Sequence, residues 1–120
     1  MRHQIKLLLL TLLLLASSDS VWAQFTFVTN TDNTIAITGY NGDGGEVSIP
    51  CKINGLLVTS IGSYAFSDQL GLTNVTISYG IVSIGQGGFE DCINLAGASI
   101  PNSITKLEIM HSHTVLALPM

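Results

Sequence analysis

The sequence contains 120 residues, of which 47% are hydrophobic and only 10% are charged, and its formal net charge is −4. This length excludes a multidomain enzyme. A high apolar fraction with few charges could indicate a membrane protein, so the position of the apolar residues decides the class of protein.

The first predicted element is a signal peptide over residues 1–23. An apolar run from Leu7 to Leu15 follows the basic residues Arg2 and Lys6 and precedes a small-residue ending at Ala23. This order is typical of a secretory signal cleaved after Ala23. The run is too short to span a bilayer, which needs roughly 20 apolar residues. We therefore expect a secreted or cell-surface protein and not a transmembrane one.

The chain that would remain after cleavage is acidic. Residues 24–120 contain two basic residues, Lys52 and Lys106, and seven acidic ones, which gives a net charge of −5. Without a basic cluster, nucleic acid and anionic membranes are not expected as partners. Gln24, and not a cysteine, follows the expected cleavage point, so a lipid anchor is not expected.

Residues 24–46 are predicted to form an N-terminal β cap and a loop. The segments Phe25–Val28 and Thr34–Ile37 alternate apolar and polar residues and are joined by turn-forming residues. They predict a hairpin that lies over the first repeat, with Phe25 or Phe27 as its lid.

Residues 47–107 form a repeat region with a period of 23 along the chain. The segments 61–84 and 84–107 are identical at seven positions, and the matched residues are mainly apolar or glycine. Such a period indicates stacked coils that bury equivalent side chains against one another. The predicted repeat core is Val47, Ile49, Ile61, Phe66, Leu72, Val75, Ile77, Ile81, Ile84, Phe89, Leu95, Ile100, Ile104 and Leu107.

The strand of each coil should present small polar residues to solvent. In residues 72–77, Val75 and Ile77 alternate with Asn74 and Thr76, so the two polar side chains should point outward. The same alternation in neighbouring coils predicts two outward rows: Ser48, Thr76 and Ser99, and Glu46, Asn74 and Gly97.

An ordered set of motifs resembles the BspA-type leucine-rich repeats of exported bacterial proteins. The motifs are Ile-Gly-x-x-Ala-Phe at 61–66, Asp-Cys-x-x-Leu at 91–95 and Ile-Pro-x-Ser-Ile-Thr-x-Leu at 100–107. The resemblance extends over about residues 25–107. It implies a mainly β, right-handed leucine-rich-repeat solenoid that is non-enzymatic and exported or surface-associated. It also implies roles in adhesion and in protein or matrix binding.

The repeat is predicted to stop at Leu107. Glu108 stands where the period requires glycine, and Ser112 stands where it requires phenylalanine. Residues 108–120 therefore form a divergent C-terminal tail. Two hypotheses remain open: a truncated or frame-altered array whose last coil is open, or a tail in which residues 115–118 fold back as a terminal strand.

Candidate chemical groups form no convincing catalytic or metal site. His111 and His113 are two ligands without a nearby cysteine or carboxylate pair, which is insufficient for a closed metal site. Glu90 and Asp91 are adjacent and so point apart on an extended chain. The loop 40–46 lacks the spaced carboxylates of a calcium loop and is typical of a plain turn. We predict no enzyme activity, no metal and no cofactor.

The two cysteines leave one question open. Export would permit a disulfide between Cys51 and Cys92. A free buried cysteine is also compatible with the sequence, because it often serves as a packing residue.

The sequence therefore predicts a secreted, non-enzymatic module for protein or surface binding and adhesion. Its expected ligand-binding residues are those of the outward strand face: Ser48, Asn74, Thr76 and Ser99. The partner would be an unknown protein or a surface glycan, and an exposed coil edge could template end-to-end self-association. The alternative is a truncated, vestigial fragment of a longer array with no independent function. A small secreted hydrolase is a third hypothesis, for which no nucleophile, acid and base come together.

Overall fold

Alternation of apolar and polar residues produces short strands, which turns and irregular loops connect. The computed structural model describes residues 23–108, and in that part no helix is long and apolar enough to cross a membrane. The predicted signal peptide, apart from Ala23, lies outside the described residues. The strands are β1 (Phe25–Thr29), β2 (Ile35–Tyr40), β3 (Gly45–Ile49), β4 (Lys52–Ile53), β5 (Leu56–Ile61), β6 (Leu72–Ile77), β7 (Ser83–Ile84), β8 (Gly97–Ser99) and β9 (Lys106–Leu107).

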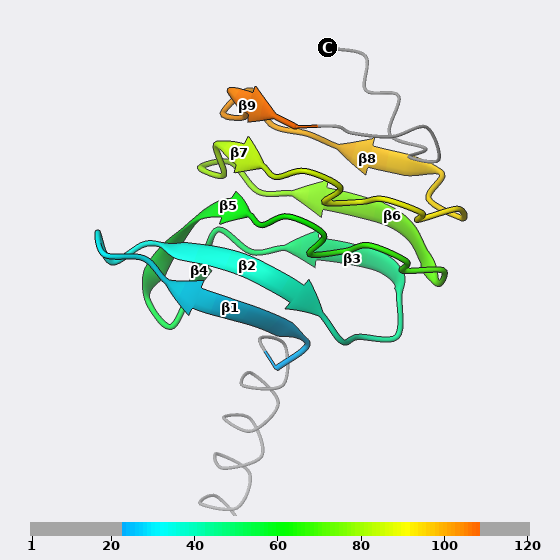
Figure 1. The fold of residues 1–120 in the computed structure, drawn as a ribbon, viewed down its shortest axis with the longest axis horizontal. Helices are drawn as coiled ribbons and strands as arrows, with labels where there is room; N and C mark the ends of the chain where they lie inside the picture. Colours follow the sequence, from blue (N-terminus) through cyan, green and yellow to red (C-terminus); the bar gives the residue numbers. More distant parts are fainter. Residues whose placement is uncertain (1–22, 109–120) are drawn as a thin grey trace, which may run out of the picture.

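Two sheets form the sides of a coiled stack. The first sheet has the order β1-β2-β5-β7-β9, with β4 paired to β5, and the second has the order β3-β6-β8. Apart from the β1–β2 and β4–β5 pairs, which are antiparallel, neighbouring strands run parallel, as one coil following another requires. Figure 1 shows the β1–β2 hairpin at one end of the stack and β8 and β9 at the other. The predicted mainly β solenoid is confirmed.

Strand pairing follows the sequence period. Val75 pairs with Ala98 in the second sheet, and Ile61 pairs with Ile84 in the first, so both steps equal the period of the repeat. The step from Val47 to its partner Val75 is longer. This coil is extended because the chain between β3 and β5 contains β4.

The β4–β5 hairpin is an element that the sequence analysis missed. Lys52 pairs with Leu57 and Ile53 with Leu56 across a turn made by Asn54 and Gly55. Both turn residues have positive φ, 52° and 80°, which is the geometry of a tight type I′ turn. Asn-Gly between two apolar stretches is the sequence signal that predicts such a turn.

A ladder of aromatic rings runs through the interior. Phe66 stacks on Phe89, with ring centroids 5.0 Å apart and planes at 15°. Tyr40 stacks on the other side of Phe66 at 5.4 Å and 23°. Phe25 then tilts against Tyr40 at 5.6 Å and 49°. The hairpin thus supplies the ring that a preceding coil would have supplied, and of the two candidate lid residues it is Phe25 that is buried.

The predicted core residues are buried to different extents along the stack. Those from Val47 to Leu95 in the predicted set are buried. Ile100, Ile104 and Leu107 are only partly buried, although they pack against the same core. These three belong to the last described coil, where no further described coil covers them. The tail beyond Glu108, and with it both hypotheses on how the array ends, lies outside the described residues.

The irregular loops that follow β5 and β7 have matching backbone conformations. Asp68 and Asp91, one period apart, both lie in the left-handed region, with φ of 59° and 55°. Tyr64 and Gly87, also one period apart, do so as well, with φ of 57° and 62°. The ring of Tyr64 lies over Gly87, because a Cβ atom placed there would be 2.5 Å from Tyr64 Cε1. The two loops therefore stack in register, like the strands that they join.

Candidate functional site: the polar strand face

The outward residues of the second sheet form one polar surface, which we call the polar strand face. It consists of Glu46 and Ser48 on β3, Asn74 and Thr76 on β6, and Gly97 and Ser99 on β8. Their neighbours Val47 and Val75 are buried, because successive residues of a strand point to opposite sides of the sheet.

Strand register arranges these residues in two rows. Ser48 pairs with Thr76, and Thr76 pairs with Ser99. In the second row Glu46 pairs with Asn74, and Asn74 pairs with Gly97. The sequence analysis thus placed the residues of both rows side by side as the structure does; their role in binding is a separate question.

Small side chains and one glycine keep the polar strand face open. A Cβ atom on Gly97 would lie 2.6 Å from Asn74 Oδ1, so the amide of Asn74 occupies the space beside the glycine. The serine and threonine hydroxyls and the amide both donate and accept hydrogen bonds. Glu46, which is exposed, is the one charged group of this face. The surface therefore carries both donors and acceptors of hydrogen bonds on all three strands.

Among residues 23–108, the other candidate groups do not form a metal site. Within residues 23–108, no three side chains of the types His, Cys, Asp or Glu are placed to hold a metal ion. His111 and His113 lie outside the described residues. In the loop 40–46, the hydroxyl of Tyr40 accepts a hydrogen bond of 3.1 Å from the backbone N–H of Gly44. This bond fixes the turn that leads into β3.

Comparison with known families decides the class of protein. The model of the BspA type leucine-rich repeat region (6 copies) matches residues 47–111, which is more than half of the chain. The chain belongs to the BspA-type leucine-rich repeat family. The resemblance drawn from the sequence motifs is confirmed, and the polar strand face is the exposed side of the repeat strands of this family member.

Solved structures of bacterial leucine-rich repeat proteins are similar. A leucine-rich repeat protein of T. pallidum has a TM-score of 0.69 and 30% identity over 71% of this chain and 40% of its own. A leucine-rich cell surface protein of Faecalibacterium prausnitzii has a TM-score of 0.65 and 28% identity over 71% of this chain and 25% of its own. The chain thus spans less than half of the length of these two proteins. No curated protein matches the sequence.

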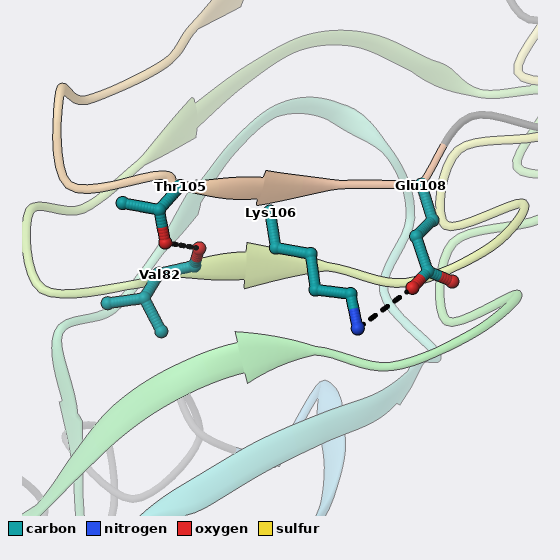
Figure 2. Close-up of polar contacts among 4 residues, drawn as sticks. All are labelled: Val82, Thr105, Lys106 and Glu108. Atoms are coloured by element: carbon teal, nitrogen blue, oxygen red, sulfur yellow. Dashed lines mark hydrogen bonds and ion pairs between the residues drawn. The ribbon is translucent and has the colours of Figure 1, made fainter.

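The last described coil makes a side-chain hydrogen bond to the preceding coil and contains an ion pair of its own (Figure 2). Thr105 Oγ1 donates a hydrogen bond of 3.4 Å to the carbonyl oxygen of Val82. Lys106 Nζ and Glu108 Oε1 lie 3.0 Å apart in an ion pair. Both charged side chains are largely exposed, so this pair adds little stability. The last two coils are therefore held together mainly by the backbone pairing of β7 with β9.

Both cysteines are free in the structure. Cys51 is exposed in the turn after β3, whereas Cys92 is buried in the loop after β7. Cys92 Sγ donates a hydrogen bond of 2.9 Å to the carbonyl oxygen of Phe66 in the neighbouring loop. Burial raises the pKa of the Cys92 thiol. The sequence left open whether Cys92 forms a disulfide with Cys51 or is a free packing residue, and the structure shows a free packing residue.

Two exposed apolar residues were missed as candidate functional residues. Leu70 and Ile93 occupy the same position in consecutive loops, and 55% and 60% of their surfaces are exposed. They lie one period apart along the chain, and neither belongs to a strand. In irregular loops, periodicity shows that two positions are equivalent but does not show which way they point.

Proposed function

We propose that the protein is an exported, non-enzymatic binding module whose polar strand face contacts a protein or a surface glycan. The observation that carries the proposal is the alignment of exposed polar residues across β3, β6 and β8. Sheets of stacked repeats expose such rows as extended recognition surfaces. The coil backbone holds the rows in place, so little ordering would be needed on binding.

Support for export and for a surface role comes from two sources. The order of basic, apolar and small residues in 1–23 is typical of a secretory signal. One similar solved structure is described as a cell surface protein. A member of this family placed outside the cell would present its repeats to other proteins and to glycans.

The proposal is tested by binding to a panel of extracellular-matrix proteins and to an array of surface glycans. The variant Asn74→Lys/Thr76→Lys places two long charged side chains in the centre of the polar strand face. We expect it to lose the binding that the wild-type chain shows, with a reduction of about tenfold or more.

A matched control adds the same two charges elsewhere. Thr31 lies between β1 and β2 and Thr105 precedes β9, and both are exposed. The variant Thr31→Lys/Thr105→Lys should bind like the wild type. The proposal is wrong if the wild-type chain binds no member of either panel, or if both variants bind equally well while circular dichroism shows that they are folded.

A further inference from the structure

Three loops stack along one edge of the solenoid, and each leads into one of the strands β3, β6 and β8. They are residues 41–44 between β2 and β3, residues 62–71 between β5 and β6, and residues 85–96 between β7 and β8. Figure 1 shows them running from the ends of β2, β5 and β7 to the right-hand side, where β3, β6 and β8 begin. We call this surface the loop edge.

The loop edge exposes an apolar pair. Leu70 and Ile93 are each more than half exposed and lie at equivalent positions of neighbouring loops. Asn94 Nδ2 donates a hydrogen bond of 2.6 Å to the carbonyl oxygen of Leu70, which fixes one loop against the next. The backbone N–H of Ala96 donates to the carbonyl oxygen of Thr73 at 2.8 Å. The two apolar side chains are thus held on ordered backbone, so a partner could bury them at little entropic cost.

Carboxylates flank this apolar pair. The backbone N–H of Asp68 donates to the carbonyl oxygen of Glu90 at 2.8 Å, which brings the two acidic residues into adjacent loops. Asp91 follows Glu90 directly and lies two residues before Ile93. Asp43 belongs to the third loop, and its carbonyl oxygen would lie 3.1 Å from a Cβ atom placed on Gly71. The loop edge therefore combines four acidic residues with the exposed side chains of Tyr64, Leu70 and Ile93.

Positive charge lies elsewhere in the described chain. The lysines of residues 23–108 are Lys52 on β4 and Lys106 on β9, and neither belongs to the three loops. Lys106 is also paired with Glu108. The loop edge consequently carries negative charge that the described side chains do not neutralise.

We propose that the loop edge is a second docking surface, which binds a cationic segment of a partner protein that carries apolar side chains. Leu70 and Ile93 supply the apolar anchors, and the carboxylates select lysine and arginine beside them. The polar strand face has small hydroxyl and amide groups and lacks such anchors. The loop edge is thus a different surface from the one in the proposed function, and either surface can bind a partner without the other.

Charge complementarity selects this occupant over others. A second copy that used the same edge would bring the carboxylates of both copies together, which costs free energy. An anionic membrane surface would be repelled for the same reason. A cationic segment gains from both parts of the surface, since apolar burial supplies affinity and charge pairing supplies orientation and a faster encounter.

The test measures the affinity of a short fluorescein-labelled peptide in which lysines alternate with leucine and serine. Fluorescence anisotropy at low ionic strength should show saturable binding to the wild-type chain. The variant Leu70→Ser/Ile93→Ser should weaken binding by about tenfold or more. Leu57→Ser is the matched control, because Leu57 on β5 is 53% exposed and lies outside the loop edge, and it should bind like the wild type.

A second variant tests the carboxylates. Asp68→Asn/Asp91→Asn keeps the size of the side chains, and asparagine tolerates the positive φ of both positions. It should weaken binding several-fold and flatten the dependence on salt. Glu46→Gln, which removes a charge from the polar strand face, should change the affinity by less than about twofold.

Several results would overturn the proposal. One is equal binding of a peptide whose leucines are replaced by serine, because attraction would then be general and electrostatic. Another is an unchanged affinity of the folded Leu70→Ser/Ile93→Ser variant. A third is a dimer in sedimentation that this variant converts to a monomer, because the occupant would then be a second copy. The two proposals can fail separately. The variant Asn74→Lys/Thr76→Lys, which should lose binding to matrix proteins or glycans, should still bind this peptide.

Discussion

The two ends of the described stack, a hairpin and a repeat coil, are packed differently. At the N-terminal end, Tyr40 and Phe25 continue the aromatic ladder, and the β1–β2 hairpin extends the first sheet. At the other end, Ile104 and Leu107 remain only partly buried among the described residues. The difference teaches that a coil gains its stability from its neighbours on both sides, as is expected for one-dimensional arrays.

The largest expected effect lies in the centre of the ladder. Phe66 is fully buried between Tyr40 and Phe89, so Phe66→Ala should lower the free energy of unfolding by about 3–5 kcal/mol. Ile104→Ala should cost less, about 1–2 kcal/mol, because part of that side chain is already in contact with solvent. Urea unfolding followed by circular dichroism measures both values. Equal losses would mean that the two regions are packed alike.

A smaller effect is expected where the hairpin meets the first coil. Tyr40→Leu removes the stacking on Phe66 and the hydrogen bond from Gly44, and should cost about 1–3 kcal/mol. Tyr40→Phe keeps the ring and removes only the hydroxyl, so it should cost about 0.5–1.5 kcal/mol. The same unfolding measurement separates the two contributions. A loss in Tyr40→Phe as large as that in Tyr40→Leu would show that the hydrogen bond, and not the ladder, joins hairpin to coil.

The smallest effect concerns the buried thiol beside the ladder. Burial raises the pKa of Cys92, so the folded state holds this proton more tightly than the unfolded state does. The protonated Cys92 thiol therefore makes its full contribution to stability below the ordinary pKa of a thiol. This contribution is lost as the pH rises from that value through the raised pKa of the folded state. Urea unfolding at neutral and alkaline pH should show a small decline that is reduced in Cys92→Ala.

Cys51 provides the internal control for that measurement. It is exposed, so Cys51→Ala should keep the alkaline decline of the wild type. In the native chain a thiol reagent should modify Cys51 rapidly and Cys92 only on unfolding. Rapid modification of both residues would show that the ladder opens locally and often.

The sequence predicted the structure correctly where strand alternation or the repeat period allows a single arrangement. Alternation within residues 72–77 showed which side chains face solvent, and the repeat period showed which of them are neighbours. The β4–β5 hairpin was missed although Asn54-Gly55 is a strong turn signal, because it interrupts the period. The exposure of Leu70 and Ile93 could not be predicted, because it depends on the path of an irregular loop.

The stacking of Tyr40 on Phe66 was also beyond the sequence pattern. Phe89 follows Phe66 by one period, whereas Tyr40 precedes it by more than one period, so the repeat does not align the three rings. The stacking of Phe66 on Phe89 follows from the period, whereas that of Tyr40 on Phe66 follows from the way in which the hairpin folds onto the first coil. A cap can take over the packing of a repeat without having the sequence of one.

The unequal coil lengths have a consequence for how such a chain can change over time. The chain is longer between Val47 and Val75 than between Val75 and Ala98, yet both steps join strands in the same register. The excess projects from the turn as the β4–β5 hairpin. Insertions in the turn between β3 and β5 therefore leave the pairing of the sheets intact. New surface loops could arise there by small duplications, while duplication of a whole coil would lengthen the polar strand face by one strand.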